Sequence, residues 1–181
     1  MIEVNKCSML YSSKKGITDV SFQVKAGEVF GYLGPNGAGK TTTIRCLLGF
    51  MKAQEGKIII NGLDSWSDAA KIQEMVGYIP GEMSLFDEMT GTEFLHFLLQ
   101  MRNVKDKTRL NELLKIFDLD PRGKIRKMSK GMKQKVGLIA AFMHDPQIYI
   151  LDEPSSGLDP LMQQVFVNLI KEERKHGKTI L

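Results

Sequence analysis

The sequence is poor in cysteine and histidine, and it has no long apolar run. Its only two cysteines, Cys7 and Cys46, stand at no metal-ligand spacing, so they predict reduced packing residues, and neither a zinc site nor a disulfide. Apolar residues never approach the roughly 20 in a row that a membrane-spanning helix needs. The first ten residues lack the basic start and apolar centre of a secretory signal. These features predict a cytosolic chain.

The length and composition are those of one globular domain. The chain has 181 residues, of which 43% are hydrophobic and 25% charged, values that are ordinary for soluble folded proteins. The charge is unevenly spread, because residues 102–135 hold twelve Lys or Arg and only four acids. Such a basic stretch either binds phosphate groups of nucleic acid or membrane lipid, or forms solvated helix faces.

Short β-rich runs dominate both ends of the chain. Alternating apolar residues predict strands over 2–10 and 20–24, with a turn between them at 12–16. A buried strand is predicted over 28–33, followed by a glycine-rich loop and a helix over 41–50. Further strands are predicted over residues 57–61, 76–79 and 147–151.

The middle of the chain has helical periodicity instead. Apolar residues at spacings of three and four predict helices over 92–101, 108–117 and 132–143. This order predicts an α/β fold with an N-terminal antiparallel β part, a mostly parallel sheet and a helical insert. We expect residues 1–83 and 145–181 to form a catalytic core and residues 84–144 a helical subdomain of a single domain.

The glycine-rich loop fits a phosphate-binding motif. Residues 34–41 read Gly-Pro-Asn-Gly-Ala-Gly-Lys-Thr, which matches G-x-x-x-x-G-K-[ST] in full, between a predicted strand and a predicted helix. The glycines let backbone N–H groups surround phosphate oxygens at the positive end of the helix. We expect Lys40 to reach the β and γ phosphates and Thr41 to bind Mg²⁺. The predicted nucleotide-binding residues of the loop are Gly34, Pro35, Asn36, Gly37, Ala38, Gly39, Lys40, Thr41 and Thr42.

Small GTPases, nucleotide kinases, helicases and transport ATPases all use such a loop. A second motif, which is acidic, narrows the choice among these enzymes. The apolar run over 148–151 delivers Asp152 and Glu153 at a strand end, where ligands of open α/β sheets bind. We expect Asp152 to hold Mg²⁺ and Glu153 to polarise the attacking water. The two acids lie more than a hundred positions after Lys40, with the helical insert between them. No Asn-Lys-x-Asp motif for reading guanine is present.

Taken in order, these motifs resemble the nucleotide-binding domain of ABC transporters, a P-loop NTPase, over nearly the whole chain. Residues 128–135 stand at the place of the family signature, usually written L-S-G-G-Q. Ser129 and Gly131 match it. Lys130 replaces its first glycine, and Met132 replaces its glutamine. The Ser-Lys-Gly-Met-Lys form is similar to the ATPases of bacterial ABC-2-type exporters, which include drug exporters.

The resemblance implies an ATP site shared between two copies of the domain. In the family two domains pair head to tail, so ATP on the phosphate loop of one contacts the signature of the other. Tyr11 stands in the place of the aromatic that stacks on adenine, a chemically reasonable role for an aromatic face, although it also suits a strand end. The additional nucleotide-contacting residues implied are Tyr11, Ser129, Lys130, Gly131, Met132 and, in a segment similar to the family's D-loop, Asp159.

The resemblance also implies a function. It predicts an ATPase that binds ATP and Mg²⁺ and powers export through separate membrane-spanning subunits, at the cytoplasmic face of the membrane and as a homodimer. One alternative is a non-transport ABC protein acting on ribosomes or DNA. Those proteins usually carry two such domains or a long coiled-coil insertion. Neither is seen in this sequence, so nucleic acid is disfavoured as a partner. Another alternative is a fragment that binds ATP without hydrolysing it.

Two positions depart from the family pattern. Gly81 stands where the family's Q-loop glutamine is expected, and Glu82 either replaces it as a Mg²⁺-linked group or is a surface acid. The family's switch histidine follows the strand that begins near Lys178, so we expect a chain truncated before that residue. None of His96, His144 and His176 occupies its place.

Overall fold

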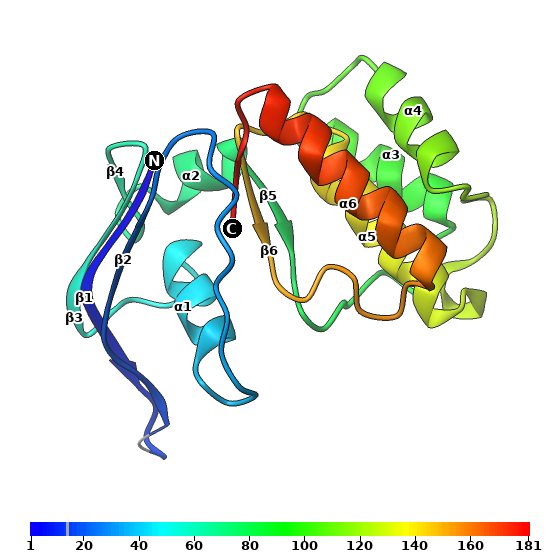
Figure 1. Cartoon of the computed structure of the whole chain (residues 1–181). Helices are drawn as coiled ribbons and strands as arrows, with labels where there is room; N and C mark the ends of the chain where they lie inside the picture. Colours follow the sequence, from blue (N-terminus) through cyan, green and yellow to red (C-terminus); the bar gives the residue numbers. More distant parts are fainter. Residues whose placement is uncertain (14) are drawn as a thin grey trace.

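The computed structural model describes residues 1–13 and 15–181, and it contains two sheets (Figure 1). The first is antiparallel, with strand order β2-β1-β3-β4, and the second is parallel, with order β5-β6-β7. Lys14, in the predicted turn over 12–16, lies outside the described residues. The strands are β1 Ile2–Leu10, β2 Gly16–Val24, β3 Glu55–Ile60, β4 Leu63–Asp64, β5 Val76–Ile79, β6 Ile148–Leu151 and β7 Thr179–Ile180.

The helices lie on both sides of the parallel sheet. In Figure 1, α1 lies between the antiparallel sheet and β6, whereas α3 to α6 lie on the opposite side of β5 and β6. No helix within residues 1–13 and 15–181 is long and apolar enough to cross a bilayer. The helices are α1 Lys40–Leu47, α2 Ala69–Met75, α3 Gly91–Met101, α4 Thr108–Ile116, α5 Lys130–Phe142 and α6 Pro160–Lys175, with a short 3-10 helix, η1, at Ile125–Lys127.

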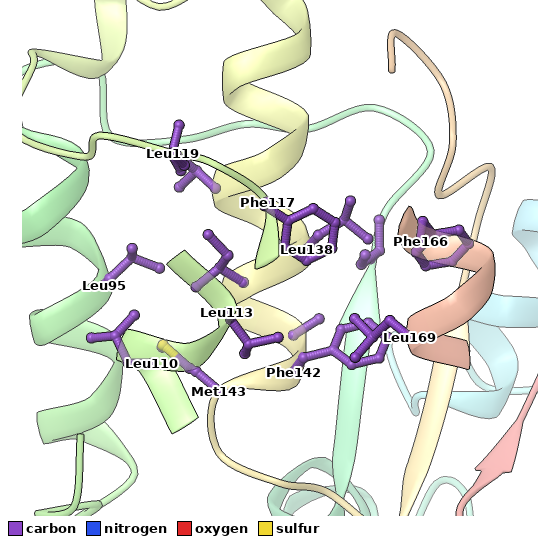
Figure 2. Packing of buried hydrophobic residues seen from close by; sticks show 14 of the residues in the cluster. Leu95, Leu110, Leu113, Phe117, Leu119, Leu138, Phe142, Met143, Phe166 and Leu169 are labelled. Atoms are coloured by element: carbon purple, nitrogen blue, oxygen red, sulfur yellow. The ribbon is translucent and has the colours of Figure 1, made fainter. Parts of the chain in front are cut away.

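Strand β6 divides two hydrophobic cores because its side chains alternate between its faces. Ile148 and Ile150 pack with α1 and the antiparallel sheet, whereas Tyr149 packs among the helices. This period of two places consecutive residues of β6 in different cores. Figure 2 shows the helical core, which includes Leu110 and Leu113 of α4, Leu138 and Phe142 of α5 with its C-cap residue Met143, and Phe166 and Leu169 of α6.

The buried strand predicted over 28–33 is wrong. Only Val29 forms a β-bridge, to Ile180 of β7, and Phe30 donates its N–H to the Ile180 carbonyl at 2.8 Å. Beyond that point the segment is irregular, and Leu33 is 92% exposed. An apolar run does not show whether a neighbouring strand is available along its whole length. Here β7 pairs with the segment only around Val29, so the rest of the run forms no strand.

Helix ends follow capping groups that the apolar periodicity did not reveal. Helix α5 begins at Lys130, two residues before the prediction, because the Ser129 hydroxyl accepts the Met132 N–H at 3.2 Å. Helix α1 ends at Leu47, before the predicted 50. Gly49 follows with φ 69°, and a Cβ there would lie 2.4 Å from the Ser65 carbonyl oxygen. The left-handed backbone at Gly49, directly after the C-cap residue Leu48, therefore ends the helix.

We expect Gly77→Ala to destabilise the fold by about 1–3 kcal/mol, the usual range for overpacking. A Cβ at Gly77 in β5 would lie 2.2 Å from the Ala141 carbonyl oxygen and 3.0 Å from Cδ1 of Tyr149. Because a backbone carbonyl cannot turn aside as a side chain can, β5 must move away from α5. Urea unfolding followed by circular dichroism measures the loss. Gly123→Ala, where a Cβ meets nothing within 4 Å, is the control, and equal midpoints for the two variants would contradict the prediction.

Candidate nucleotide-binding site

The glycine-rich loop leads into α1, a helix whose first turn has no side-chain cap. Gly39 is the N-cap of α1, no side chain caps the helix, and its first turn has no acid. Gly39 has φ 88°, and a Cβ there would lie 2.4 Å from Cγ2 of Ile17, so only glycine fits. Lys40 Nζ donates to the carbonyls of Gly34 at 2.7 Å and Pro35 at 3.1 Å. The loop therefore combines a helix N-terminus with a lysine, the combination that binds phosphate.

The loop meets the end of β6 through a single short hydrogen bond. Thr41 Oγ1 donates to Asp152 Oδ2 at 2.8 Å, across 111 positions of sequence. Asp152 is buried, at 5% exposure, and its N–H donates to the Ile79 carbonyl at 2.9 Å, which fixes it beside β5. The structure thus brings together the two residues predicted to bind Mg²⁺.

This pair fits Mg²⁺ better than a metal with an all-protein site. Among residues 1–13 and 15–181 no group of three or more His, Cys, Asp or Glu is placed to hold a metal ion. Mg²⁺ prefers oxygen ligands, and it is commonly bound by one or two carboxylates together with substrate phosphates and water. A hydroxyl and a carboxylate at the edge of a phosphate-binding loop meet that requirement.

Glu153 lies at the phosphate loop in an unusual backbone conformation. Its φ is 50°, in the left-handed region that six other non-glycine residues of the described chain also adopt. Its side chain is exposed and lines a cavity of about 340 Å³. The cavity is lined by Tyr11, Lys15, Gly16, Asn36, Gly37, Gly39, Lys40, Thr41, Thr42 and Glu153.

Tyr11 lies in that same cavity, at the end of β1. The ring is half-buried, and its hydroxyl donates to Sδ of Met51 at 3.3 Å. The Tyr11 N–H donates to the Lys15 carbonyl at 2.8 Å. The structure therefore places the predicted adenine-stacking residue beside the phosphate loop, with both polar ends of the residue held.

The segment around Gly81 forms a second polar cavity, of about 400 Å³, behind Thr41 and Asp152. A Cβ at Gly81 would lie 3.2 Å from Oδ2 of Asp152, so glycine leaves room beside that carboxylate. Glu82 is exposed and lines the cavity. Arg45, which the sequence reasoning did not single out, lines it as well. Its only sequence signal is its position one helical turn after Thr41 on α1.

Charges in this second cavity act on Tyr78, which also lines it. Burial raises the pKa of the Tyr78 hydroxyl, the Asp152 carboxylate raises it further, and Arg45 lowers it. The hydroxyl therefore stays protonated at neutral pH. It faces an acidic and a basic group in the same cavity.

The segment that resembles the signature packs against its own chain. A Cβ at Gly131 would lie 2.9 Å from the Gly157 carbonyl oxygen, so the segments around these glycines are in close contact. Buried Gln134, missed by the sequence reasoning, donates Nε2 to the Pro154 carbonyl at 2.8 Å. A polar residue on an otherwise apolar helix face was its only signal. None of the described residues 128–133 lines the cavity at the phosphate loop.

Asp159 is the N-cap of α6. Its Oδ1 accepts the Met162 N–H at 2.9 Å, and Pro160 follows at the first helical position, where proline is favoured. The residue is exposed. The structure thus places Asp159 outside the phosphate-loop cavity, where it caps a helix.

Comparison with known proteins identifies the family. Residues 17–156 match the family described as ABC transporter. The chain is 35% identical over 191 residues to the "ABC transporter ATP-binding protein NatA" of Bacillus subtilis, covering all of the chain and 78% of that protein. It is 35% identical over 178 residues to the "Bacitracin transport ATP-binding protein BcrA" of Bacillus licheniformis, covering 95% of the chain and 58% of that protein.

A solved structure agrees with the sequence comparisons. The structure titled "Structure of ATP binding subunit of ABC transporter" superimposes with a TM-score of 0.90 at 34% identity, covering all of this chain and 78% of that one. The chain spans between 55% and 78% of the length of several curated relatives. From the motif geometry and these matches together, the chain belongs to the ABC transporter family and contains its ATP-binding domain.

Proposed function

We propose that this chain binds Mg²⁺–ATP at the phosphate loop and hydrolyses it to ADP and phosphate, as the ATPase of an ABC exporter. The observation that carries the proposal is the 2.8 Å hydrogen bond between Thr41 and Asp152. It joins a loop built for phosphate to a strand end that carries two acids. Tyr11 and the exposed Glu153 line the same cavity as Lys40 of the loop. Side chains suited to the adenine ring, the attacking water and the phosphates therefore surround one cavity.

The residues divide the work as follows. Backbone N–H groups of residues 37–42 and Lys40 bind the phosphates, and Tyr11 stacks on the adenine. Thr41 and Asp152 hold Mg²⁺, with Glu82 as a further oxygen donor in the adjoining cavity. When bound, the ion neutralises charge on the phosphates. Glu153 accepts the proton of the attacking water.

We further propose that a second copy of the chain completes the site. Ser129, Lys130, Gly131 and Met132 lie at the start of α5, which presents a helix N-terminus suited to a γ-phosphate. They do not line the cavity of their own phosphate loop. A head-to-tail dimer would place them, together with Asp159, on the ATP of the partner copy. The dimer would act at the cytoplasmic face of a membrane, on membrane-spanning subunits.

Export is favoured over action on nucleic acid by two observations. One relative is named as a bacitracin transport protein. In addition, five of the twelve basic residues over 102–135 form ion pairs with acids of the helical segment or of α6. These ion pairs are Arg109–Glu173, Arg122–Asp120, Lys124–Glu93, Arg126–Glu88 and Lys133–Asp87. Basic groups already paired in this way contribute less to binding a phosphate backbone.

The proposal is tested first by binding. We expect Lys40→Ala to weaken Mg²⁺–ATP affinity at least about tenfold, because a charge-assisted hydrogen bond of roughly 1.5–3 kcal/mol to the phosphates is lost. Isothermal titration calorimetry measures the change. Lys171→Ala, which removes an exposed lysine of α6, is the matched control and should bind as the wild type does. Unchanged affinity in Lys40→Ala would refute the site.

A further inference from the structure

A cluster of side chains around the buried hydrogen bond between Tyr149 and Glu173 lies outside the cavity at the phosphate loop. It consists of Tyr149, Phe142, Glu173 and Arg109, named here the Tyr149 cluster. The Tyr149 ring stacks on Phe142 with centroids 4.2 Å apart and planes at 19°. Its hydroxyl donates to Glu173 Oε2 at 2.9 Å, and Arg109 forms an ion pair with Oε1 of the same carboxylate. Tyr149 is 0% and Glu173 2% exposed.

Each member comes from a different element, and three of these elements carry candidate site residues. Tyr149 belongs to β6, which delivers Asp152 three positions later. Phe142 ends α5, the helix that Ser129 caps at its other end. Glu173 lies in the last turns of α6, which begins after Asp159. The cluster therefore joins the far ends of the elements that present the acidic, signature-like and D-loop-like segments.

The fourth member connects the helical segment to this junction. Arg109 lies in the first turn of α4 and spans 64 positions of sequence to reach Glu173. A buried carboxylate is tolerated only when it is paired and hydrogen-bonded, and removing a partner leaves a costly unpaired charge. Movement of α4 away from α6 would leave Glu173 in that condition. The contact consequently favours one arrangement of α4 relative to α6.

The hydroxyl of Tyr149 is a constant donor in this arrangement. Burial raises its pKa, and the neighbouring charge of Glu173 raises it further. The hydroxyl thus remains protonated across the physiological range and keeps its bond to Glu173. The stacked ring holds the same residue against α5.

We infer that Tyr149, Glu173 and Arg109 are positioning residues, which set the placement of α4 and α5 against β6 and α6. Through these elements they fix where Ser129 and Asp159 lie relative to Asp152. The importance of this placement for ATP-dependent dimerisation rests on the proposed function, whereas the placement itself does not. None of the three residues lines the cavity beside the phosphate loop.

Distances between spin labels test the placement directly. Labels at Lys115→Cys on α4 and Lys57→Cys on β3, both exposed, report how the helical segment sits against the core. The native thiols do not compete, because Cys7 and Cys46 are buried and burial raises the pKa of both, that of Cys46 to about 12. We expect electron–electron double resonance to give one narrow distribution for the labelled wild type.

Two substitutions should broaden or shift that distribution. Tyr149→Phe keeps the ring and removes only the hydroxyl, and Arg109→Met keeps the length of the side chain and removes its charge. Ile60→Val in β3, outside the helical core, is the control. Thermal unfolding measures the stability loss of each variant. The distributions are then compared at temperatures equally far below each variant's unfolding midpoint. A merely structural role predicts equal broadening in all three variants.

A second measurement separates positioning from binding. We expect Tyr149→Phe to raise the protein concentration needed for Mg²⁺–ATP-dependent dimerisation at least about fivefold, the lower end of typical coupling between sites. Mg²⁺–ATP affinity of the monomer should stay within about twofold, because no cluster residue lines the cavity. An unchanged label distribution in Tyr149→Phe, or equal broadening in Ile60→Val, would overturn the inference. If the wild type binds no Mg²⁺–ATP, the proposed function fails, and the label distributions still decide the placement.

Discussion

A Glu153→Gln variant should hydrolyse ATP at least about a hundredfold more slowly than the wild type, the lower end of what a general base contributes. The amide of glutamine cannot accept the proton of the attacking water. Its shape is nearly that of glutamate, so the contacts of the loop are retained. Phosphate release at saturating Mg²⁺–ATP measures the rate.

Binding should survive the same substitution, which makes the test specific. Glu153 is exposed and stands at the edge of the cavity, whereas Lys40 and the amides of the loop supply the attraction for phosphate. Removing one negative charge beside the γ-phosphate reduces repulsion, so ATP-bound dimers should persist. Glu172→Gln, on the exposed face of α6, is the control with unchanged turnover. Rapid hydrolysis by Glu153→Gln would assign the proton transfer to another group.

The parts of the site that could be predicted from the sequence are those in which consecutive residues suffice. The phosphate loop is one such part, because its glycines, Lys40 and Thr41 act from adjacent positions between helix and loop. The end of β6 is another, since an apolar run followed by two acids indicates a strand that delivers them to a sheet edge. Their meeting at Thr41 and Asp152 agrees with the expectation that the two motifs form one site, although the segment before the loop pairs with β7 only around Val29.

The parts that could not be predicted depend on distant partners. Glu173 stands in the run Lys-Glu-Glu-Arg-Lys at a helix end, which has the composition of a solvated face. Its burial is decided by Arg109 and Tyr149, which lie 64 and 24 positions away. The strand prediction over 28–33 was wrong because it, too, depended on a distant partner. The apolar residues of that run have the composition of a buried strand, but the neighbouring strand pairs with it only around Val29.

Asp159 and Ser129 suit two roles, capping a helix and contacting nucleotide. Each was predicted to contact nucleotide, and each caps a helix within its own chain. A side chain that accepts a backbone N–H of the first turn lies at the positive end of the helix, which is also where an anion binds. Capping therefore places both residues where the phosphate of an ATP bound to a partner copy could reach them. Variants of these residues separate the two roles when stability and dimerisation are both measured.

Replacing Asp152 by asparagine should abolish the strengthening of ATP affinity by Mg²⁺. The side chain is buried and accepts the Thr41 hydroxyl at 2.8 Å, so the carboxylate lies where a metal on the loop would sit. Asparagine keeps the size and one acceptor oxygen but removes the negative charge that attracts the ion. Nucleotide affinity measured by calorimetry with Mg²⁺ and with EDTA gives a ratio for each variant. We expect that ratio to fall to about one in Asp152→Asn.

The same ratio decides the role of Glu82. Its carboxylate lines the cavity that also contains Thr41 and Asp152, and Gly81 leaves room beside the Asp152 oxygen. If Glu82 contributes an oxygen to the ion, Glu82→Gln should lower the ratio partway, because a second carboxylate strengthens a Mg²⁺ site without being its principal ligand. A wild-type ratio in Glu82→Gln would show that Glu82 is a surface acid without a role in binding the ion. A wild-type ratio in Asp152→Asn would show that the ion does not bind at the end of β6. Because both variants are read by binding, neither result depends on the rate at which the chain hydrolyses ATP.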